Sequence, residues 1–239
     1  MNSKAVFRPA AERFHSQLNW LDSWHSFSFG SHQDPNWRGF GPLRVINDDT
    51  IAAGQGFGMH PHRDMEIITV MVEGELTHAD SMGHSEVLRA GEVQRMSAGT
   101  GIMHSEINRN TASCRLLQIW IEPAQQGIQP AYEQRQVSIE AGWTTLISPN
   151  PNHSAMSIAR SASIWRARPR PNDELRLPNC SGSHFWLQMI EGQVTADLGS
   201  ETTHCLRRGD GLGWQVSAFD TLHVLDPSQS TDLLLIGMQ

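Results

Sequence analysis

Cysteine is scarce in this sequence, with three residues in 239. Cys114, Cys180 and Cys205 form no C-x-x-C pair, and an odd number of cysteines does not make a complete disulfide framework. The first residues also lack the apolar core of a secretory signal peptide. These absences predict a protein that works in the reducing cytoplasm.

Long apolar runs and an excess of basic residues are absent as well. The apolar stretches, such as residues 233–236, are far shorter than the roughly 20 residues that a membrane-spanning helix needs. Lys and Arg number 18 against 25 Asp and Glu, which gives a formal net charge of -7. Residues 166–170 read R-A-R-P-R, but no broad basic stripe offers a footprint for nucleic acid. We therefore expect neither a membrane-spanning role nor direct binding to nucleic acid.

Short apolar runs bounded by turn residues dominate the chain instead. Residues 67–72, 116–121 and 185–190 have the length of a buried strand, and each lies close to a turn signal. The hydrophobic fraction of 38% and the charged fraction of 18% are those of an ordinary globular protein. The sequence therefore predicts an all-β protein, long enough for one large domain or for two of roughly 100 residues each.

One segment of the chain recurs 118 residues later. Residues 71–77 read M-V-E-G-E-L-T, and residues 189–195 read M-I-E-G-Q-V-T. At the same offset, L-R-A-G-E at residues 88–92 is matched by L-R-R-G-D at residues 206–210. Generic turn dipeptides could produce either match alone, but they do not explain the shared register. We expect two related β-barrels, each with a strand that ends in a Glu-Gly turn and a return strand that ends in a second tight turn.

Turn formers and charged residues gather between the two copies. Residues 149–151 are Pro-Asn-Pro, and residues 166–172 are also rich in such residues. We place a linker near residues 124–150, between an N-terminal domain of residues 1–123 and a C-terminal domain of residues 151–239.

Two short patterns contain residues that bind metals: His60 with His62, and His104 with Glu106. In an extended strand, residues i and i+2 project from the same face, so each pair can reach one point. Because the chain has 12 histidines, one H-x-H pair alone is a weak signal. Glycines precede both pairs and give the backbone freedom to bend around a small site; they lie at positions 54, 56, 58, 99 and 101.

Three imidazoles and a carboxylate suit one divalent ion such as iron, copper, nickel, manganese or zinc, and no cysteine is placed to form a thiolate site. Four protein ligands can leave one or two positions of an octahedron open for a substrate oxygen or dioxygen, which favours catalysis over a structural role. At the offset of 118 residues, the second copy has Pro178, Cys180, Leu222 and Val224. The second copy has therefore lost the ligand set.

Other residues near these patterns receive simpler interpretations. Four histidines, at positions 25, 32, 78 and 84, lack ligand spacing, and we expect them at the surface or as caps. Met59 and Met103 should face away from the neighbouring imidazoles and pack in the core.

The metal-binding pattern lies within longer motifs. Gly54, followed after five residues by His60-Pro-His62 and then by Glu66, resembles the first cupin motif, although the closing glycine, Gly74, comes one residue late. Three further segments read L-D-S-W-H-S-F-S-F at residues 21–29, R-V-I-N-D at residues 44–48 and M-S-A-G-T-G-I-M-H-S-E at residues 96–106. Together these segments resemble the pirin family over most of the N-terminal half.

This resemblance implies a bicupin fold, in which two related jelly-roll barrels pack together. It implies a degenerate C-terminal barrel without metal and one Fe(II) ion in the N-terminal barrel, held by His60, His62, His104 and Glu106. The ligand types alone leave copper, nickel, manganese and zinc open. The resemblance also makes Glu66 a candidate to support the ligands by hydrogen bonds. Gln118, in the run L-Q-I-W-I-E at residues 117–122, could hydrogen-bond an imidazole N–H or face the solvent.

Several bacterial members of this family are similar to quercetin 2,3-dioxygenases, which open the heterocyclic ring of a flavonol with dioxygen and release carbon monoxide. The resemblance therefore implies an oxidoreductase for a small aromatic or enolic substrate and dioxygen, with Glu106 as its general base. Two alternatives stay open. One is a redox-sensing iron-binding module that regulates a protein partner, as in eukaryotic pirins, and the other is an enzyme for a different enolic substrate.

Overall fold

The computed structural model describes residues 5–151, 155–179, 181–199, 203–215 and 222–239. The regular structure of these residues is β-strand, apart from two 3-10 turns, η1 (Ala10–Glu12) and η2 (Pro35–Trp37). No helix in the described ranges is long and apolar enough to span a membrane. The all-β prediction is confirmed.

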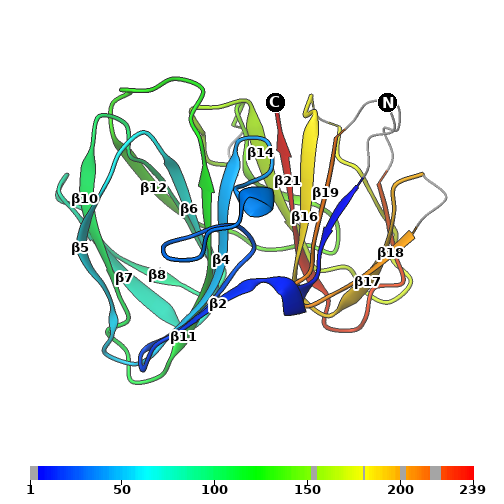
Figure 1. Cartoon of the computed structure of the whole chain (residues 1–239), viewed down its shortest axis with the longest axis horizontal. Helices are drawn as coiled ribbons and strands as arrows, with labels where there is room; N and C mark the ends of the chain where they lie inside the picture. Colours follow the sequence, from blue (N-terminus) through cyan, green and yellow to red (C-terminus); the bar gives the residue numbers. More distant parts are fainter. Residues whose placement is uncertain (1–4, 152–154, 180, 200–202, 216–221) are drawn as a thin grey trace. The chain divides into compact units, whose positions relative to one another are not determined.

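The chain forms two compact units. The first unit consists of Arg13–Val137 and Ile158–Arg160, and the second consists of Met1–Glu12, Ser138–Ser157 and Ser161–Gln239. Each unit contains one larger and one four-stranded sheet, and all of their strand pairs are antiparallel. Figure 1 shows the strands of both units.

The first unit has a seven-stranded sheet in the order β12-β9-β6-β11-β4-β3-β2 and a four-stranded sheet in the order β5-β10-β7-β8. The strands are β2 (Phe14–Gln17), β3 (Leu21–His25), β4 (Leu43–Ile51), β5 (Gly56–His62), β6 (Glu66–Glu73), β7 (Glu75–Asp80), β8 (Ser85–Arg89), β9 (Glu92–Ser97), β10 (Ile102–Ile107), β11 (Cys114–Ile121) and β12 (Ala131–Gln136).

The second unit has a six-stranded sheet in the order β1-β19-β16-β21-β14-β13 and a four-stranded sheet in the order β15-β20-β17-β18. The strands are β1 (Val6–Arg8), β13 (Thr144–Ile147), β14 (Ala162–Ala167), β15 (Leu175–Arg176), β16 (His184–Glu191), β17 (Gln193–Asp197), β18 (Thr203–Arg207), β19 (Gly211–Gln215), β20 (His223–Leu225) and β21 (Asp232–Met238).

The two units repeat the same strand order. The run β9-β6-β11-β4 corresponds to β19-β16-β21-β14, and β5-β10-β7-β8 corresponds to β15-β20-β17-β18. A shift of 118 residues places β6 on β16 and β8 on β18 without any change of bounds. The turns repeat as well, because Gly74 and Gly192 both adopt a left-handed conformation, with φ of 72° and 76°. The predicted duplication and bicupin architecture are confirmed.

The edges of the units differ from the expected boundaries of residues 1–123, 124–150 and 151–239. The N-terminal strand β1 pairs with β19 of the second unit. The expected linker contains β12, which pairs with β9 in the first unit, and β13, which pairs with β14 in the second. These strands join sheet edges through backbone hydrogen bonds, which leave little trace in a hydrophobic pattern. The assignment of a metal-binding and a metal-free domain stays a prediction.

The interiors of the two barrels differ in polarity at matching positions. Leu222 and Val224 are fully buried in the apolar core of the second unit. The residues 118 positions earlier are His104 and Glu106, which are also buried, at 0% and 3% exposure. The first barrel therefore buries polar groups at positions where the second barrel has apolar core residues.

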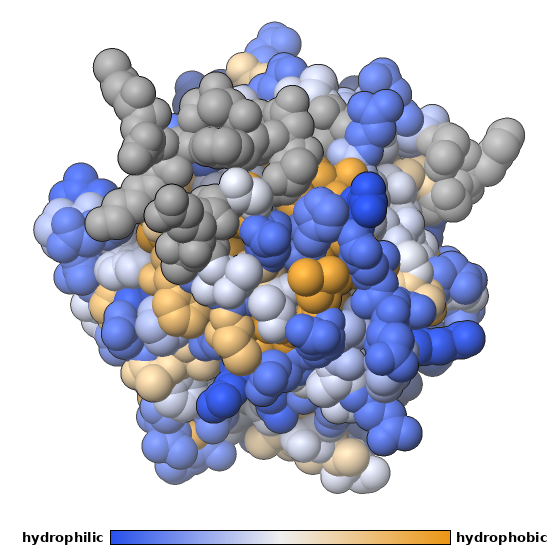
Figure 2. All heavy atoms as spheres, turned by 90° about the vertical axis from the view of Figure 1, so that its right-hand side faces the viewer, coloured by the Kyte–Doolittle hydropathy of each residue, from blue (hydrophilic) through white to orange (hydrophobic). Residues whose placement is uncertain are grey.

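On the face of the second unit shown in Figure 2, hydrophilic side chains predominate and apolar side chains gather near the centre of the view.

Candidate metal centre

The predicted ligands lie on two paired strands of the first unit. β5 carries His60 and His62, and β10 carries His104 and Glu106. The strands are antiparallel, with His104 opposite His60. Met59 and Met103 occupy the alternate positions and are 55% and 39% exposed. The prediction of their direction is therefore right, but the prediction that they pack in the core is wrong.

The three imidazoles converge. Their candidate ligand nitrogens all lie within 4.8 Å of one another. The ring centroid of His60 lies 4.4 Å from that of His104, and His62 lies 4.8 Å from each of the other two rings. Such a spacing is compatible with three nitrogens that share one ion, because metal–nitrogen bonds are about 2.0–2.1 Å long for zinc.

Burial keeps two of these imidazoles, those of His62 and His104, neutral. Burial and the neighbouring rings of His60 and His62 lower the pKa of His104 to about 2. Burial, together with His60, lowers the pKa of His62 to about 4. The Nδ1 atom of His60 donates a hydrogen bond to the carbonyl oxygen of Gly58 over 2.8 Å, so its Nε2 atom is left as the donor to a metal. At neutral pH His62 and His104 can therefore offer electron pairs to a cation without first losing protons.

Unsatisfied nitrogens show that this cluster fits a metal ion. Among the residues that the structure describes, neither Nδ1 nor Nε2 of the buried His104 has a hydrogen-bond partner. A buried polar atom without a partner costs about 1–3 kcal/mol, and native proteins contain few of them. A divalent cation at the centre of the three rings would satisfy one of these nitrogens. The donor set therefore suits a borderline transition metal.

Glu106 lies beside the histidines but is already hydrogen-bonded. Its Oε2 atom accepts from Nε2 of Gln118 over 2.9 Å, and its Oε1 atom accepts from the hydroxyl of Thr69 over 3.3 Å. The register of β10 against β5 shifts between His104 and Glu106, which marks a β-bulge. Burial raises the pKa of Glu106. Its role as the fourth ligand stays a prediction.

The two candidate supporting residues have different surroundings. Gln118 is 8% exposed and contacts Glu106 directly, so it supports the carboxylate rather than an imidazole. Glu66 is fully buried, and its Oε2 atom accepts from the hydroxyl of Ser97 over 2.8 Å. The hydrogen bonds described for Glu66 do not reach the three imidazoles. Its predicted contact with the ligands has no support in these hydrogen bonds.

Two histidines expected at the surface are buried instead. His25 and His78 are 2% and 1% exposed. His78 lies opposite Glu106 in the β7–β10 ladder, its Nε2 atom is 3.1 Å from Oδ2 of Asp80, and its ring centroid is 5.4 Å from that of His104. The sequence signal for His78 and Asp80 is their i, i+2 spacing, which repeats the spacing of the ligands.

A cavity of ≈ 430 Å³ opens beside the cluster. Its volume lies within the range of small-molecule sites, about 300–1,000 Å³. His60, His62 and Glu106 line one part of it, and Phe57 and Trp120 are among its aromatic lining residues. The arrangement places two of the three clustered imidazoles and a carboxylate on the wall of a pocket that can hold a flat aromatic molecule.

Known proteins resemble both halves of this chain. Residues 7–121 match the pirin family, and residues 145–238 match the quercetinase C-terminal cupin domain. The chain is 46% identical over 189 residues to quercetin 2,3-dioxygenase of Escherichia coli strain K12, which covers 79% of this chain and 82% of that one. The chain belongs to the pirin family. The predicted likeness to a quercetinase-type oxidoreductase is thereby confirmed.

Solved structures show the same relationship. This pirin superposes on YhhW from Escherichia coli with a TM-score of 0.91 and 38% identity, over 99% of this chain and 98% of that one. A second structure, of bacterial pirin YhhW in complex with nickel(II), gives a TM-score of 0.90 and 38% identity, over 98% and 99% of the two chains. A divalent metal is thus present in a structure of a relative.

Proposed function

We propose that this pirin is a metal-dependent dioxygenase that opens the heterocyclic ring of a flavonol such as quercetin and releases carbon monoxide. The observation that carries this proposal is the convergence of His60, His62 and His104, of which His60 and His62 line a ≈ 430 Å³ cavity. The likeness to proteins named quercetin 2,3-dioxygenase supports the substrate class.

The metal would be held by the three imidazoles, with Glu106 as the fourth ligand. We propose Fe(II) as the ion, while the same donors also suit nickel, copper, manganese or zinc. When bound, the ion supplies Lewis acidity toward an enolic oxygen and a centre for dioxygen chemistry.

Glu106 is the proposed catalytic base. Its carboxylate would accept the proton of the flavonol 3-hydroxyl, and its pKa is raised by burial, which makes it a stronger base than an exposed glutamate. Hydrogen bonds from Gln118 and Thr69 hold the carboxylate in place. A positioned base in the cavity wall can therefore act on a substrate held against the aromatic residues.

The aromatic lining residues Phe29, Phe57 and Trp120 would contact the rings of a flavonol. Ring faces and edges in such contacts contribute about 0.5–1.5 kcal/mol beyond simple burial. Trp120 also packs edge-on against His62, with centroids 4.9 Å apart, so it links the ring-binding wall to the metal ligands.

We also place the protein in the cytoplasm. Two of the three cysteines are described as free thiols, Cys114 buried and Cys205 exposed. Free thiols are the usual state in a reducing compartment, which supports this assignment.

Carbon monoxide release from quercetin tests the function. Protein purified without added metal is first assayed for metal content by elemental analysis, and separate samples are then loaded anaerobically with iron, nickel, copper or manganese. We expect oxygen-dependent carbon monoxide release that Glu106→Ala lowers strongly. Turnover no higher than that of Glu106→Ala with every metal would overturn the proposal. A redox-sensing module would bind the metal but show no turnover.

A further inference from the structure

Four buried polar side chains line the cavity beside the metal cluster. Ser23 and His25 lie on β3, and Asn47 and Asp49 lie on β4. Ser23 is paired with Asp49 in the ladder, and His25 is paired with Asn47, so the four form a compact square. They are 1–3% exposed, and all four face the same ≈ 430 Å³ cavity as His60 and Glu106.

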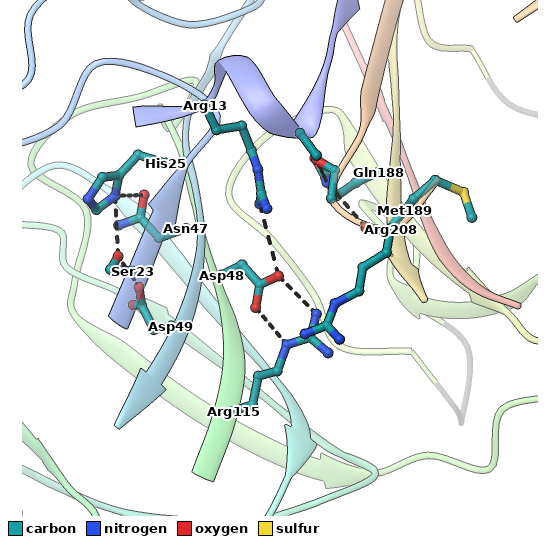
Figure 3. Close-up of polar contacts among 12 residues, drawn as sticks. Arg13, Ser23, His25, Asn47, Asp48, Asp49, Arg115, Gln188, Met189 and Arg208 are labelled. Atoms are coloured by element: carbon teal, nitrogen blue, oxygen red, sulfur yellow. Dashed lines mark hydrogen bonds and ion pairs between the residues drawn. The ribbon is translucent and has the colours of Figure 1, made fainter. Parts of the chain in front are cut away.

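The hydrogen bonds of this square leave one acceptor unused. Nδ1 of His25 lies 2.8 Å from Oδ1 of Asn47, and Ser16 lies 2.9 Å from Nε2 of the same ring, so both ring nitrogens are engaged. The hydroxyl of Ser23 donates to Oδ1 of Asp49 (Figure 3). Among the described residues, the second oxygen, Oδ2, receives no hydrogen bond.

A carboxylate in this position is costly to the fold. Burial raises the pKa of Asp49 to about 7, and the single donor Ser23 offsets only part of the cost. Among the described residues Asp49 forms no ion pair, and Arg13 and Arg115 pair instead with the neighbouring carboxylate of Asp48. Within the described part of the chain, Asp49 is therefore a buried acceptor without a charge partner, on the wall of a pocket.

The second barrel shows that the fold does not need this polarity. The residues 118 positions after Asn47 and Asp49 are Trp165 and Ala167, which are 6% and 0% exposed and belong to the apolar core of the second unit. The same two positions of the same strand are thus apolar in the barrel whose core has Leu222 in place of His104. The polar square accompanies the imidazole cluster and is not a structural requirement of the barrel.

We propose that Asp49, held by Ser23, determines substrate specificity by accepting a hydrogen bond from a phenolic hydroxyl of the substrate. This inference rests on the proposed function. The hydroxyl that donates to Asp49 is one of those on the outer rings of the flavonol. It is separate from the 3-hydroxyl that approaches Glu106. A substrate without that hydroxyl leaves the buried acceptor unpaired, which lowers its affinity about 10- to 100-fold.

Equilibrium binding tests the proposal without turnover. The full-length protein, with the metal it retains on purification, is titrated anaerobically at pH 8 by calorimetry with quercetin and with two analogues. One analogue lacks the hydroxyls of the pendant ring, and the other lacks those of the fused ring. We expect one analogue to bind about 10- to 100-fold more weakly than quercetin. Asp49→Asn replaces the ionised acceptor by a neutral and weaker amide oxygen, so it should lose much of this factor for quercetin and change the affinity of that analogue by less than about twofold.

Asp22→Asn is the matched control. Asp22 lies on the same strand as Ser23, pairs with His15 at the outer face and is not part of the cavity lining, so its variant should bind every ligand as the wild type does. If Asp49→Asn does not fold, Ser23→Ala tests the same discrimination with a smaller expected loss, because it removes only the donor that holds Asp49.

Three results decide the matter. If one analogue is discriminated and Asp49→Asn removes the discrimination, the proposal is supported. If quercetin and both analogues bind equally, or if Asp49→Asn weakens all three equally, the specificity role is overturned while the proposed function stands. If none of the three binds, the proposed function and this inference both fail.

Discussion

Gln118 donates a hydrogen bond from Nε2 to Oε2 of Glu106 over 2.9 Å, and this bond joins the two sheets of the first barrel. Gln118 belongs to β11 of the seven-stranded sheet, whereas Glu106 belongs to β10 of the four-stranded sheet. In register with Gln118 lie Asn47 on β4 and Thr69 on β6. Polar side chains thus form a row across three neighbouring strands, and two of them, Gln118 and Thr69, hydrogen-bond the carboxylate of Glu106.

Replacement of Gln118 by leucine should weaken the site without unfolding it. The variant leaves Oε2 of Glu106 without its donor, so the carboxylate loses its fixed orientation. We expect metal affinity or kcat to fall about 10- to 100-fold, as for other residues that orient ligands. Chelator competition measures the affinity. The control is Gln134→Leu, at a position that hydrogen-bonds the carbonyl of Val87; equal behaviour of the two variants would contradict the prediction.

Replacement of His104 by leucine should have opposite effects on the metal-free and metal-loaded forms. In the metal-free protein the variant removes two buried nitrogens without partners, so its melting temperature should rise or stay equal. In the presence of metal the wild type should gain stability by mass action and the variant should gain none. Calorimetry with and without a chelator measures both. A metal-free variant that melts well below the wild type would show that the imidazole contributes to packing.

The stability of the metal-free protein should fall as the pH is lowered below about 6.5, in part because of His104. The folded pKa of His104 is about 2 and its ordinary value is 6.5, so between these values the unfolded chain binds a proton that the folded chain does not. At pH 5 this lowers the free energy of unfolding by about 2 kcal/mol. Urea unfolding at pH 7.5 and pH 5 measures this loss. We expect the free energy of unfolding of His104→Leu to fall by about 2 kcal/mol less than that of the wild type. Equal losses in both proteins would contradict the prediction.

Local spacing and the internal repeat were sufficient to predict two related β-barrels and the clustering of three histidines, whereas the bicupin assignment depended on the resemblance to pirins. An i, i+2 pair reports which face a strand presents, and the β5–β10 ladder then places His60 opposite His104. The loss of the set in the second copy also follows from the repeat, and Leu222 is indeed part of an apolar core.

Residues that reach the site through pairing of distant strands could not be predicted in this way. His78 comes beside Glu106 through the β7–β10 ladder, and Asp49 meets Ser23 through the β3–β4 ladder. Register between strands is fixed by the packing of the whole barrel, so the i, i+2 spacing of His78 and Asp80 does not by itself place them beside Glu106. The same holds for β1, whose pairing with β19 depends on an open sheet edge.

A buried ion pair joins two central strands of the first barrel, and its carboxylate is not part of the cavity lining. Arg115 on β11 contacts Asp48 on β4 through two hydrogen bonds of 2.7 and 2.9 Å, and both residues are at most 7% exposed (Figure 3). The second barrel has the pair with its charges exchanged between the corresponding strands, since Arg166 on β14 contacts Asp232 on β21 at 2.7 Å. Each barrel therefore joins the same two central strands by one buried pair.

Asp48→Leu should lower the free energy of unfolding of the first barrel by about 3–5 kcal/mol, because it leaves the guanidinium of Arg115 buried without its carboxylate. The control Arg63→Ala removes the exposed partner of Asp64 and should cost less than about 1 kcal/mol. Urea unfolding measures both, and metal content at low temperature should match the wild type in each, because Asp48 is not part of the cavity lining. A loss below about 1 kcal/mol in Asp48→Leu would mean that packing, rather than the ion pair, holds β4 against β11.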